Sequence, residues 1–126
     1  MLKHFWCEDV ATAAKACLEN CPQDTQRSIS IAEDVCQHRF VLDFGQQVTD
    51  IQWDCIPAGD PEWLYAMNRH TCFVNLGKAW QYTKEEKYAR KYAELIEDWI
   101  DRVPLTPQSE GDTWRSLEAG LRCEYW

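Results

Sequence analysis

The stretch from Asp60 to Tyr82 constrains the fold more than any other, because apolar residues recur along it with the period of an α-helix. Asp60 is a good N-cap, and Pro61 and Glu62 both suit the first turn of a helix. The apolar positions are Trp63, Tyr65, Ala66, Met67, Phe73, Val74, Leu76, Gly77 and Trp80. They cover more than one face, which is typical of a helix buried among other helices. We expect one continuous helix over about residues 61–82.

The preceding half of the chain predicts shorter elements. An alanine-rich helix is expected from Glu8 to about Asn20, with Pro22 ending it and residues 23–28 forming a polar connector. Ser30 and Glu33 have the spacing of a capping box, which predicts a short helix over residues 31–38. Residues 40–44 are expected to be extended, and residues 46–59 irregular.

The following half predicts two more helices. Thr83 and Glu86 form a second capping box, so a helix should run to about Val103, where Pro104 ends it. Almost no linker separates this helix from the one before, so the pair must fold back antiparallel. Residues 105–111 are expected to form a loop. Asp112 is expected to cap the last helix, which should run from Thr113 to the end.

These elements predict an all-α chain of antiparallel helical hairpins. At 126 residues it should form one domain, or a fragment of one, with a modest core. The last turn contains Tyr125 and Trp126 and has no capping residue after it. Because helix ends are rarely so apolar, we expect residues 1–126 to come from a longer protein.

Charge excludes some classes of partner. The net charge is −8, with −6 in residues 1–60 and −2 in residues 61–126, which argues against general binding to nucleic acid. Any site for an anionic ligand should lie in the second half, as a local cluster. No apolar run reaches the length of a membrane span, and residues 1–7 do not resemble a signal peptide, so we expect no membrane partner.

The seven cysteines cannot all pair within one chain, since their number is odd. They favour reduced thiols in the core and therefore a reducing, cytoplasmic compartment. Cys17 and Cys21 are one helical turn apart and could hold half of a metal site. No second pair accompanies them, and the chain has no phosphate loop and no metal-binding helix signature, so neither a metal nor a cofactor is expected.

Three consecutive polar residues, Asn68, Arg69 and His70, interrupt the most apolar helix. Their side chains point about 100° apart from one residue to the next, so at most two can face the same space. Two interpretations remain open. Either His70 is a core histidine and Arg69 pairs with a buried acid, or the helix faces a cleft where arginine and histidine receive an anionic substrate.

Two tryptophans stand beside charged residues, as Trp53-Asp54 and Trp114-Arg115. A flat apolar face next to a directional polar group is what a sugar subsite needs. Packing tryptophans with incidental neighbours would give the same pattern. These residues are therefore candidates for substrate binding, but composition alone does not go beyond a helical domain.

The order of the residues resembles the N-terminal region of the heparinase II/III family of polysaccharide lyases, most closely its heparinase III branch. The matching residues, in chain order, are Ile31-Ala32-Glu33-Asp34, His38-Arg39-Phe40, Ile51-Gln52-Trp53, Asp60-Pro61-Glu62-Trp63, Asn68-Arg69-His70, Leu76-Gly77-Lys78-Ala79, Thr83, Glu86-Lys87-Tyr88-Ala89, Asp98-Trp99-Ile100, Pro104-Leu105, Trp114-Arg115-Ser116-Leu117-Glu118 and Arg122. The match covers most of residues 31–126, and the first thirty residues match weakly.

The resemblance implies part of an incomplete α/α toroid, followed in the family by a C-terminal β-sandwich. Such enzymes cleave uronic-acid polysaccharides, such as heparan sulfate or alginate, by β-elimination. By resemblance, Arg69 and His70 would line the cleft near the uronate, Asn68 would accompany them, and Trp53, Trp114 and Arg115 would hold the sugar chain. The expected partners are an acidic polysaccharide and the remainder of a parent chain.

The resemblance leaves the catalytic residues unassigned. The family's asparagine, tyrosine and histidine for proton transfer lie beyond this segment, so His70 is only a possible catalytic residue. The loop before Trp114 is also shorter than is usual in the family. We therefore expect a parent lyase whose segment is inactive alone; the alternative is a non-catalytic helical carbohydrate-binding or scaffold domain. The resemblance favours the periplasm, whereas the free cysteines favour the cytoplasm.

Overall fold

The structure is a computed structural model, which describes residues 9–41, 45 and 47–126. Its elements are α1 (Val10–Asn20), α2 (Pro22–Cys36), β1 (Phe40–Val41), β2 (Gln47–Val48), the 3-10 turn η1 (Pro57–Gly59), α3 (Pro61–Arg69), α4 (Thr71–Thr83), α5 (Glu86–Arg102), the 3-10 turn η2 (Ser109–Gly111) and α6 (Ser116–Tyr125). The chain is mainly helical, which confirms the predicted all-α class.

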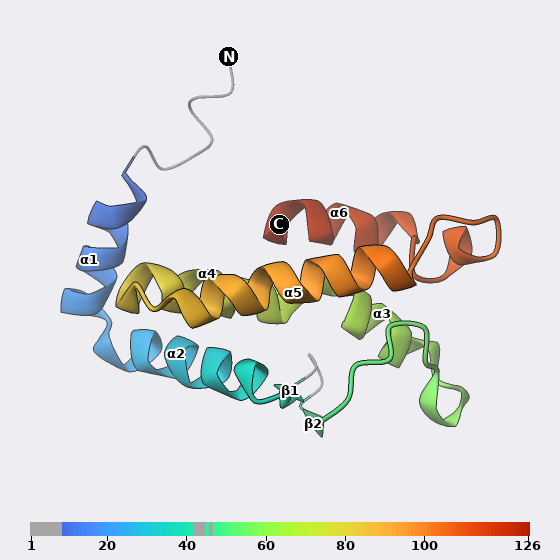
Figure 1. Cartoon of the computed structure of the whole chain (residues 1–126), viewed down its shortest axis with the longest axis horizontal. Helices are drawn as coiled ribbons and strands as arrows, with labels where there is room; N and C mark the ends of the chain where they lie inside the picture. The colour runs from blue at the N-terminus through green and yellow to red at the C-terminus, as the bar shows by residue number, and fades with distance from the viewer. Residues whose placement is uncertain (1–8, 42–44, 46) are drawn as a thin grey trace, which may run out of the picture.

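The long helices run alternately in opposite directions (Figure 1). α2 packs on α4, α4 packs on α5, and α6 returns above α5 toward the middle of the molecule. α1 crosses the start of α2 and the end of α4. At the opposite end of the molecule, α3 packs against α6. β1 and β2 form a small antiparallel ladder in which Phe40 pairs with Val48. The predicted extension at residues 40–44 is therefore present at Phe40 and Val41, while residues 42–44 lie outside the described residues.

Aromatic side chains fill the centre of this arrangement. Trp53, Phe73, Tyr88 and Trp99 are almost completely buried, and they come from the irregular segment, α4 and α5. Burial of such large apolar groups contributes roughly 25 cal/mol per Å2 removed from water. The core therefore joins the segment before α3 to the antiparallel helices α4 and α5.

The predicted single helix over residues 61–82 is wrong, because the chain breaks it at His70. This residue has φ 61° and ψ 33°, a left-handed conformation that is uncommon outside glycine and asparagine. The carbonyl of Asn68 would accept from the residue 72 amide in a continuous helix. Instead it accepts from the guanidinium of Arg122, at 2.8 Å. A tertiary hydrogen bond thus accompanies the break between α3 and α4.

The N-terminal helices also differ from the prediction. Pro22 begins α2 instead of only ending α1, and the predicted connector over residues 23–28 is helical. Proline is well suited to the first helical position, since its missing N–H would have had no partner there. Ser30 consequently lies inside α2, so its capping box is not a helix start.

The later helix starts are displaced as well. α5 begins at Glu86, and Thr83 is the last residue of α4, where its hydroxyl accepts from the Glu85 amide. α6 begins at Ser116 after Arg115, so Asp112 does not cap it. Residues 113–115 instead form a short connection that carries Trp114 and Arg115 across the end of the bundle.

The cysteines lie nearer the surface than predicted. Cys21 and Cys123 are exposed, the other described cysteines are partly buried, and none forms a disulfide within the described residues. The described residues contain no group of three or more histidine, cysteine, aspartate or glutamate side chains arranged to hold a metal ion. In the same part of the chain, no helix is both long and apolar enough to cross a bilayer.

Candidate functional site

Asn68 is the centre of a buried polar cluster at the end of α3. Its side-chain amide donates to the carbonyls of Trp53 at 2.7 Å and Leu64 at 2.8 Å. Its side-chain oxygen accepts from the indole N–H of Trp99 at 2.8 Å. The residue is 0% exposed. Asn68 therefore holds the irregular segment and α5 against α3, and its side chain is out of reach of a ligand in this conformation.

His70 is likewise enclosed, at 1% exposed. Its ring stacks on Trp126 at 5.7 Å between centroids, and Nδ1 accepts from the Trp126 indole at 3.0 Å. Trp53 and Trp99 contact the imidazole edge-on. Burial, together with the nearby charge of Arg122, lowers the pKa of His70 to about 3. The imidazole is therefore neutral at physiological pH.

Arg122 of α6 completes the buried cluster. One nitrogen of its guanidinium donates to the carbonyls of Asn68 and Thr113. The guanidinium lies 4.5 Å from the ring centroid of Trp99 and 5.3 Å from that of Trp114. Burial lowers the pKa of Arg122 and the charge of Glu118 raises it, with a net decrease. This arginine still carries its charge at neutral pH, because an arginine side chain stays protonated far above neutral pH.

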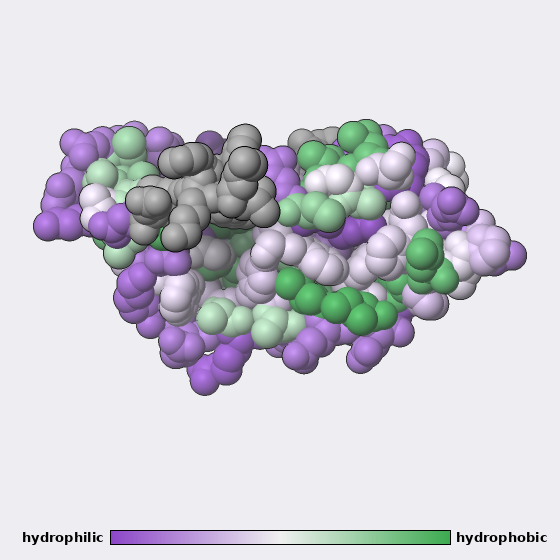
Figure 2. Space-filling model, turned by 90° about the horizontal axis from the view of Figure 1, so that it is seen from above, coloured by the Kyte–Doolittle hydropathy of each residue, from purple (hydrophilic) through white to green (hydrophobic). Residues whose placement is uncertain are grey.

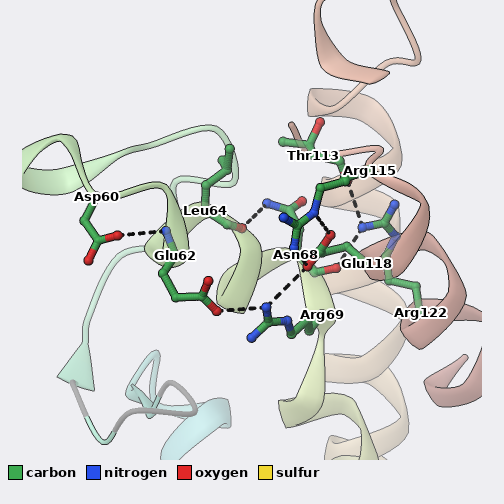
Figure 3. A network of polar contacts seen from close by, with 9 residues as sticks. All are labelled: Asp60, Glu62, Leu64, Asn68, Arg69, Thr113, Arg115, Glu118 and Arg122. Atoms are coloured by element: carbon green, nitrogen blue, oxygen red, sulfur yellow. Dashed lines mark hydrogen bonds and ion pairs between the residues drawn. The ribbon is translucent and has the colours of Figure 1, made fainter. Parts of the chain in front are cut away.

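Arg69 and Arg115 converge on one buried carboxylate (Figure 3). Glu118 is fully buried and receives two hydrogen bonds of 2.6 Å from Arg115. Arg69 approaches the same carboxylate at 3.4 Å and pairs with Glu62 at 2.8 Å. Burial raises the pKa of Glu118, but the hydrogen bonds from Arg115 and the two positive charges lower it below its ordinary value. The group is therefore a stable anion that positions both arginines.

The two arginines remain within reach of solvent. The side chain of Arg69 is 18% exposed, and Arg115 is half-buried. The Arg115 guanidinium lies 3.6 Å from the centroid of the Tyr65 ring, a cation–π contact that fixes its plane. Glu62, the second partner of Arg69, is 48% exposed. Arg69, Arg115, Tyr65 and Glu62 thus form a surface patch, which we call the paired-arginine patch.

The two candidate tryptophans make their contacts with other parts of the fold. Trp53 is buried, and its indole donates to Asp98 at 2.6 Å. Trp114 is half-buried, donates to the carbonyl of Val103 at 2.9 Å and packs on Trp99. Both indole N–H groups therefore bind other parts of the chain.

Of the predicted site residues, the structure brings Arg69 and Arg115 together at the surface. It places Asn68, His70 and Trp53 in the core, with Trp114 at its edge. Sequence reasoning assigned no role to Tyr65, Glu118 or Arg122. The i, i+3 spacing of Arg115 and Glu118 and the i, i+4 spacing of Glu118 and Arg122 were the signal that could have found Glu118 and Arg122.

Comparisons with known proteins agree with this architecture. Residues 7–125 match the family model described as the heparinase II/III N-terminus. The heparin-sulfate lyase of Bacteroides stercoris is 30% identical, with 75% of this chain aligned to 18% of that protein. The heparin-sulfate lyase of Pedobacter heparinus is also 30% identical, with 66% of this chain aligned to 12% of it.

Comparison with solved structures points to the same family. A solved structure of heparinase III with methylated lysines has a TM-score of 0.68 and 28% identity, and the match covers 77% of this chain and 19% of that one. The chain thus spans less than a fifth of the length of each of these three proteins. The resemblance found in the sequence is confirmed: this chain belongs to the heparinase II/III family and corresponds to its N-terminal region.

Proposed function

We propose that this chain acts as the N-terminal helical segment of a lyase that cleaves a uronic-acid polysaccharide. Membership of the heparinase II/III family and the two heparin-sulfate lyase relatives support a polysaccharide substrate. The segment supplies part of the substrate-binding surface, and the full set of catalytic residues belongs to the remainder of a longer chain.

The observation that carries the proposal is the paired-arginine patch. Two guanidinium groups from α3 and from the start of α6 are held by one buried carboxylate. Planar guanidinium groups bind carboxylates and sulfates through parallel hydrogen bonds. Glu62 occupies Arg69 through a partly exposed ion pair, which has a small net stability. A uronate carboxylate can therefore replace Glu62 at little cost.

This binding mode suits β-elimination. An arginine that neutralises the uronate carboxylate makes the C5 proton more acidic, so that a base elsewhere can remove it. His70 is neutral but enclosed, so in this segment it positions the end of α3 instead of transferring a proton. Asn68 has the same positioning role through its hydrogen bonds to Trp53 and Trp99. Trp53 and Trp114 support the patch from the interior.

The remainder of the chain would pack against apolar surface that this segment leaves open. A groove of about 570 Å3 lies between α1, α4 and α6, and Val10, Phe73, Val74 and Tyr125 are among its lining residues. Seen from above, hydrophobic residues reach the surface in several patches between hydrophilic ones (Figure 2). Large apolar patches on a protein surface often mark interfaces. Further helices covering them would extend the bundle toward an α/α toroid.

Binding of a heparan sulfate oligosaccharide to the 126-residue chain tests the patch. Arg69→Gln should weaken binding roughly tenfold or more, since it removes a charge-assisted contact. Arg90→Gln is the matched control, because it removes an exposed arginine from α5 with the same change of net charge. Equal losses in both variants would mean that only overall charge matters and would refute the patch.

Release of unsaturated uronate tests whether the full set of catalytic residues lies outside this segment. The 126-residue chain alone should give no product, whereas a chain extended through the remaining regions of the family should give product and lose most of its rate with Arg69→Gln. Product from the segment alone would overturn the proposal. Binding without product in the extended chain would instead establish the alternative, a carbohydrate-binding or scaffold domain.

A further inference from the structure

Two cysteines lie one helical turn apart at the end of α1. Cys17 is partly buried and Cys21 is exposed. The amide of Cys21 donates to the carbonyl of Cys17 at 2.8 Å, so the last helical hydrogen bond of α1 joins their backbones. Residues four apart on a helix lie on the same face, with Cβ atoms about 5–6 Å apart. The two side chains therefore leave α1 on the same side.

Tyr82 of α4 contacts this pair of cysteines. Burial raises the pKa of Tyr82, and so do the thiolate charge of Cys17, a hydrogen bond with Cys17 and the thiolate charge of Cys21, with a further contribution from Asp24. The Tyr82 phenol therefore keeps its proton at neutral pH and can donate it to the Cys17 sulfur. Cys17 and Tyr82 both line the groove of about 570 Å3 between α1, α4 and α6, so a small ligand can reach them from solvent.

The backbone at Cys21 is held by the start of α2. Its carbonyl accepts from the Thr25 amide at 3.0 Å and from the Thr25 hydroxyl at 3.1 Å. Thr25 is buried, and Pro22 fixes the first helical position of α2. The corner that carries the second cysteine is thus formed before a ligand arrives, which lowers the entropic cost of binding.

The spacing of the two cysteines determines which kind of link can join them. A disulfide needs Cβ atoms about 3.5–4.5 Å apart, which is less than the spacing of residues four apart on a helix. A metal ion held by two thiolates, with metal–sulfur bonds of about 2.3 Å, allows roughly 4.6 Å between the sulfurs. A bridging ion therefore fits the helical spacing, whereas a direct sulfur–sulfur bond would distort the last turn of α1.

The number of available ligands determines which ion can bind. Structural zinc takes four ligands, and the described residues contain no group of three or more histidine, cysteine, aspartate or glutamate side chains arranged to hold a metal. Soft thiolate ligands also select copper(I), which is stable with two sulfur ligands in a line. The pair interpreted in the sequence as half of a metal site is thus sufficient for this ion.

We propose that Cys17 and Cys21 form a two-coordinate site for copper(I), with Tyr82 as the residue that orients the Cys17 sulfur. On binding, two S–H bonds break and two S–Cu bonds form. Two protons pass to solvent and copper stays in its +1 state, so no electron is transferred. The complex carries one negative charge. A hydrogen bond from Tyr82 stabilises it, and Lys78 adds a positive charge to the same groove.

This site is independent of the proposed function. Figure 1 shows α1 at one end of the molecule and α3, which carries Arg69, at the other. Arg69→Gln should therefore leave copper(I) binding unchanged and weaken binding of the acidic oligosaccharide. Cys21→Ser should have the opposite pair of effects, so failure of one proposal is distinguishable from failure of the other.

Anaerobic titration of the reduced 126-residue chain with copper(I), in competition with the chelator bicinchoninate, tests the proposal. One ion should bind per chain, and X-ray absorption should show two sulfur neighbours. Cys21→Ser should weaken binding roughly hundredfold or more, because the second thiolate of the same chain acts at a high effective concentration. This variant should fold, since Cys21 is exposed and serine is well suited to the residue before a helix.

Cys123→Ser is the matched control, because it removes the other exposed cysteine of the described residues, and it should bind copper(I) normally. Tyr82→Phe should keep one ion per chain and weaken binding roughly three- to tenfold, since it removes one hydrogen bond to sulfur. Three results would overturn the proposal: no copper(I) retained against the chelator, equal affinity of Cys21→Ser and the unmodified chain, or an equal loss with Cys123→Ser. Unchanged affinity of Tyr82→Phe would overturn the role of the tyrosine.

Discussion

The end of α3 has two layers with similar chemistry and opposite exposure. In the inner layer, Asn68 and Arg122 are enclosed by tryptophans and bind backbone carbonyls. In the outer layer, Arg69 and Arg115 bind carboxylates and remain partly exposed. Both layers contain arginine, so residue type does not distinguish them. The partner does at Arg69: carbonyls and aromatic rings hold the guanidinium of Arg122 permanently, whereas the exposed carboxylate of Glu62 can be exchanged for a substrate group.

This difference predicts that inner substitutions change stability and outer substitutions change binding. Asn68→Leu should have the largest effect, about 3–5 kcal/mol of lost unfolding free energy, because the Trp53 carbonyl and the Trp99 indole N–H would stay buried without partners. Urea denaturation measures it. Asn75→Leu, at a half-buried position on α4, is the control and should cost far less. Similar losses would show that Asn68 does not organise the core.

Arg122→Met should follow, with a loss of about 2–4 kcal/mol. It removes hydrogen bonds to the carbonyls of Asn68 and Thr113 and two contacts with tryptophan rings. Thermal and urea unfolding of this variant and of Arg90→Met provide the comparison. A stable Arg122→Met variant would place this arginine outside the group that maintains the helix break.

The inner layer should also make stability depend on pH. The pKa of His70 is 6.5 in the unfolded chain and about 3 in the folded chain. Below pH 6.5 the unfolded state therefore binds more protons than the folded state. Stability should therefore fall as pH falls, by about 1.4 kcal/mol per pH unit from this group, or about 2 kcal/mol between pH 6.5 and 5. Denaturation at several pH values measures the slope, and His70→Gln should reduce it. A His70 imidazole NMR signal that titrates near pH 6 in the folded chain would contradict this prediction.

The smallest effect on stability belongs to the outer layer. Glu62→Gln removes a partly exposed ion pair with Arg69 and should change the unfolding free energy by less than about 1 kcal/mol. The same substitution should strengthen binding of an acidic oligosaccharide, since Arg69 no longer has to release a competing carboxylate. Urea denaturation of Glu62→Gln and the unmodified chain checks the change in stability, and calorimetric titration with the oligosaccharide checks the change in binding. Unchanged or weaker binding would mean that substrate does not replace Glu62.

The sequence predicted the class of fold well and the boundaries poorly. Helical periodicity at residues 61–82 identified a buried helical stretch, but it could not show that Arg122 takes the carbonyl that would continue the helix. Pro22 by itself does not show whether one helix ends or the next begins, because proline both stops helices and suits their first position. Only packing against α4 decides between these roles.

The candidate site divides in the same way. Residue order alone led to the heparinase II/III family and selected Arg69 and Arg115, which the structure brings onto one carboxylate. The left-handed backbone at His70 separates α3, which carries Arg69, from α4, and the start of α6 brings Arg115 to the same carboxylate. The amino-acid sequence by itself therefore determined helices, apolar content and family. The tertiary structure decided which polar residues are enclosed and which reach solvent, because exposure depends on contacts between segments far apart in the chain.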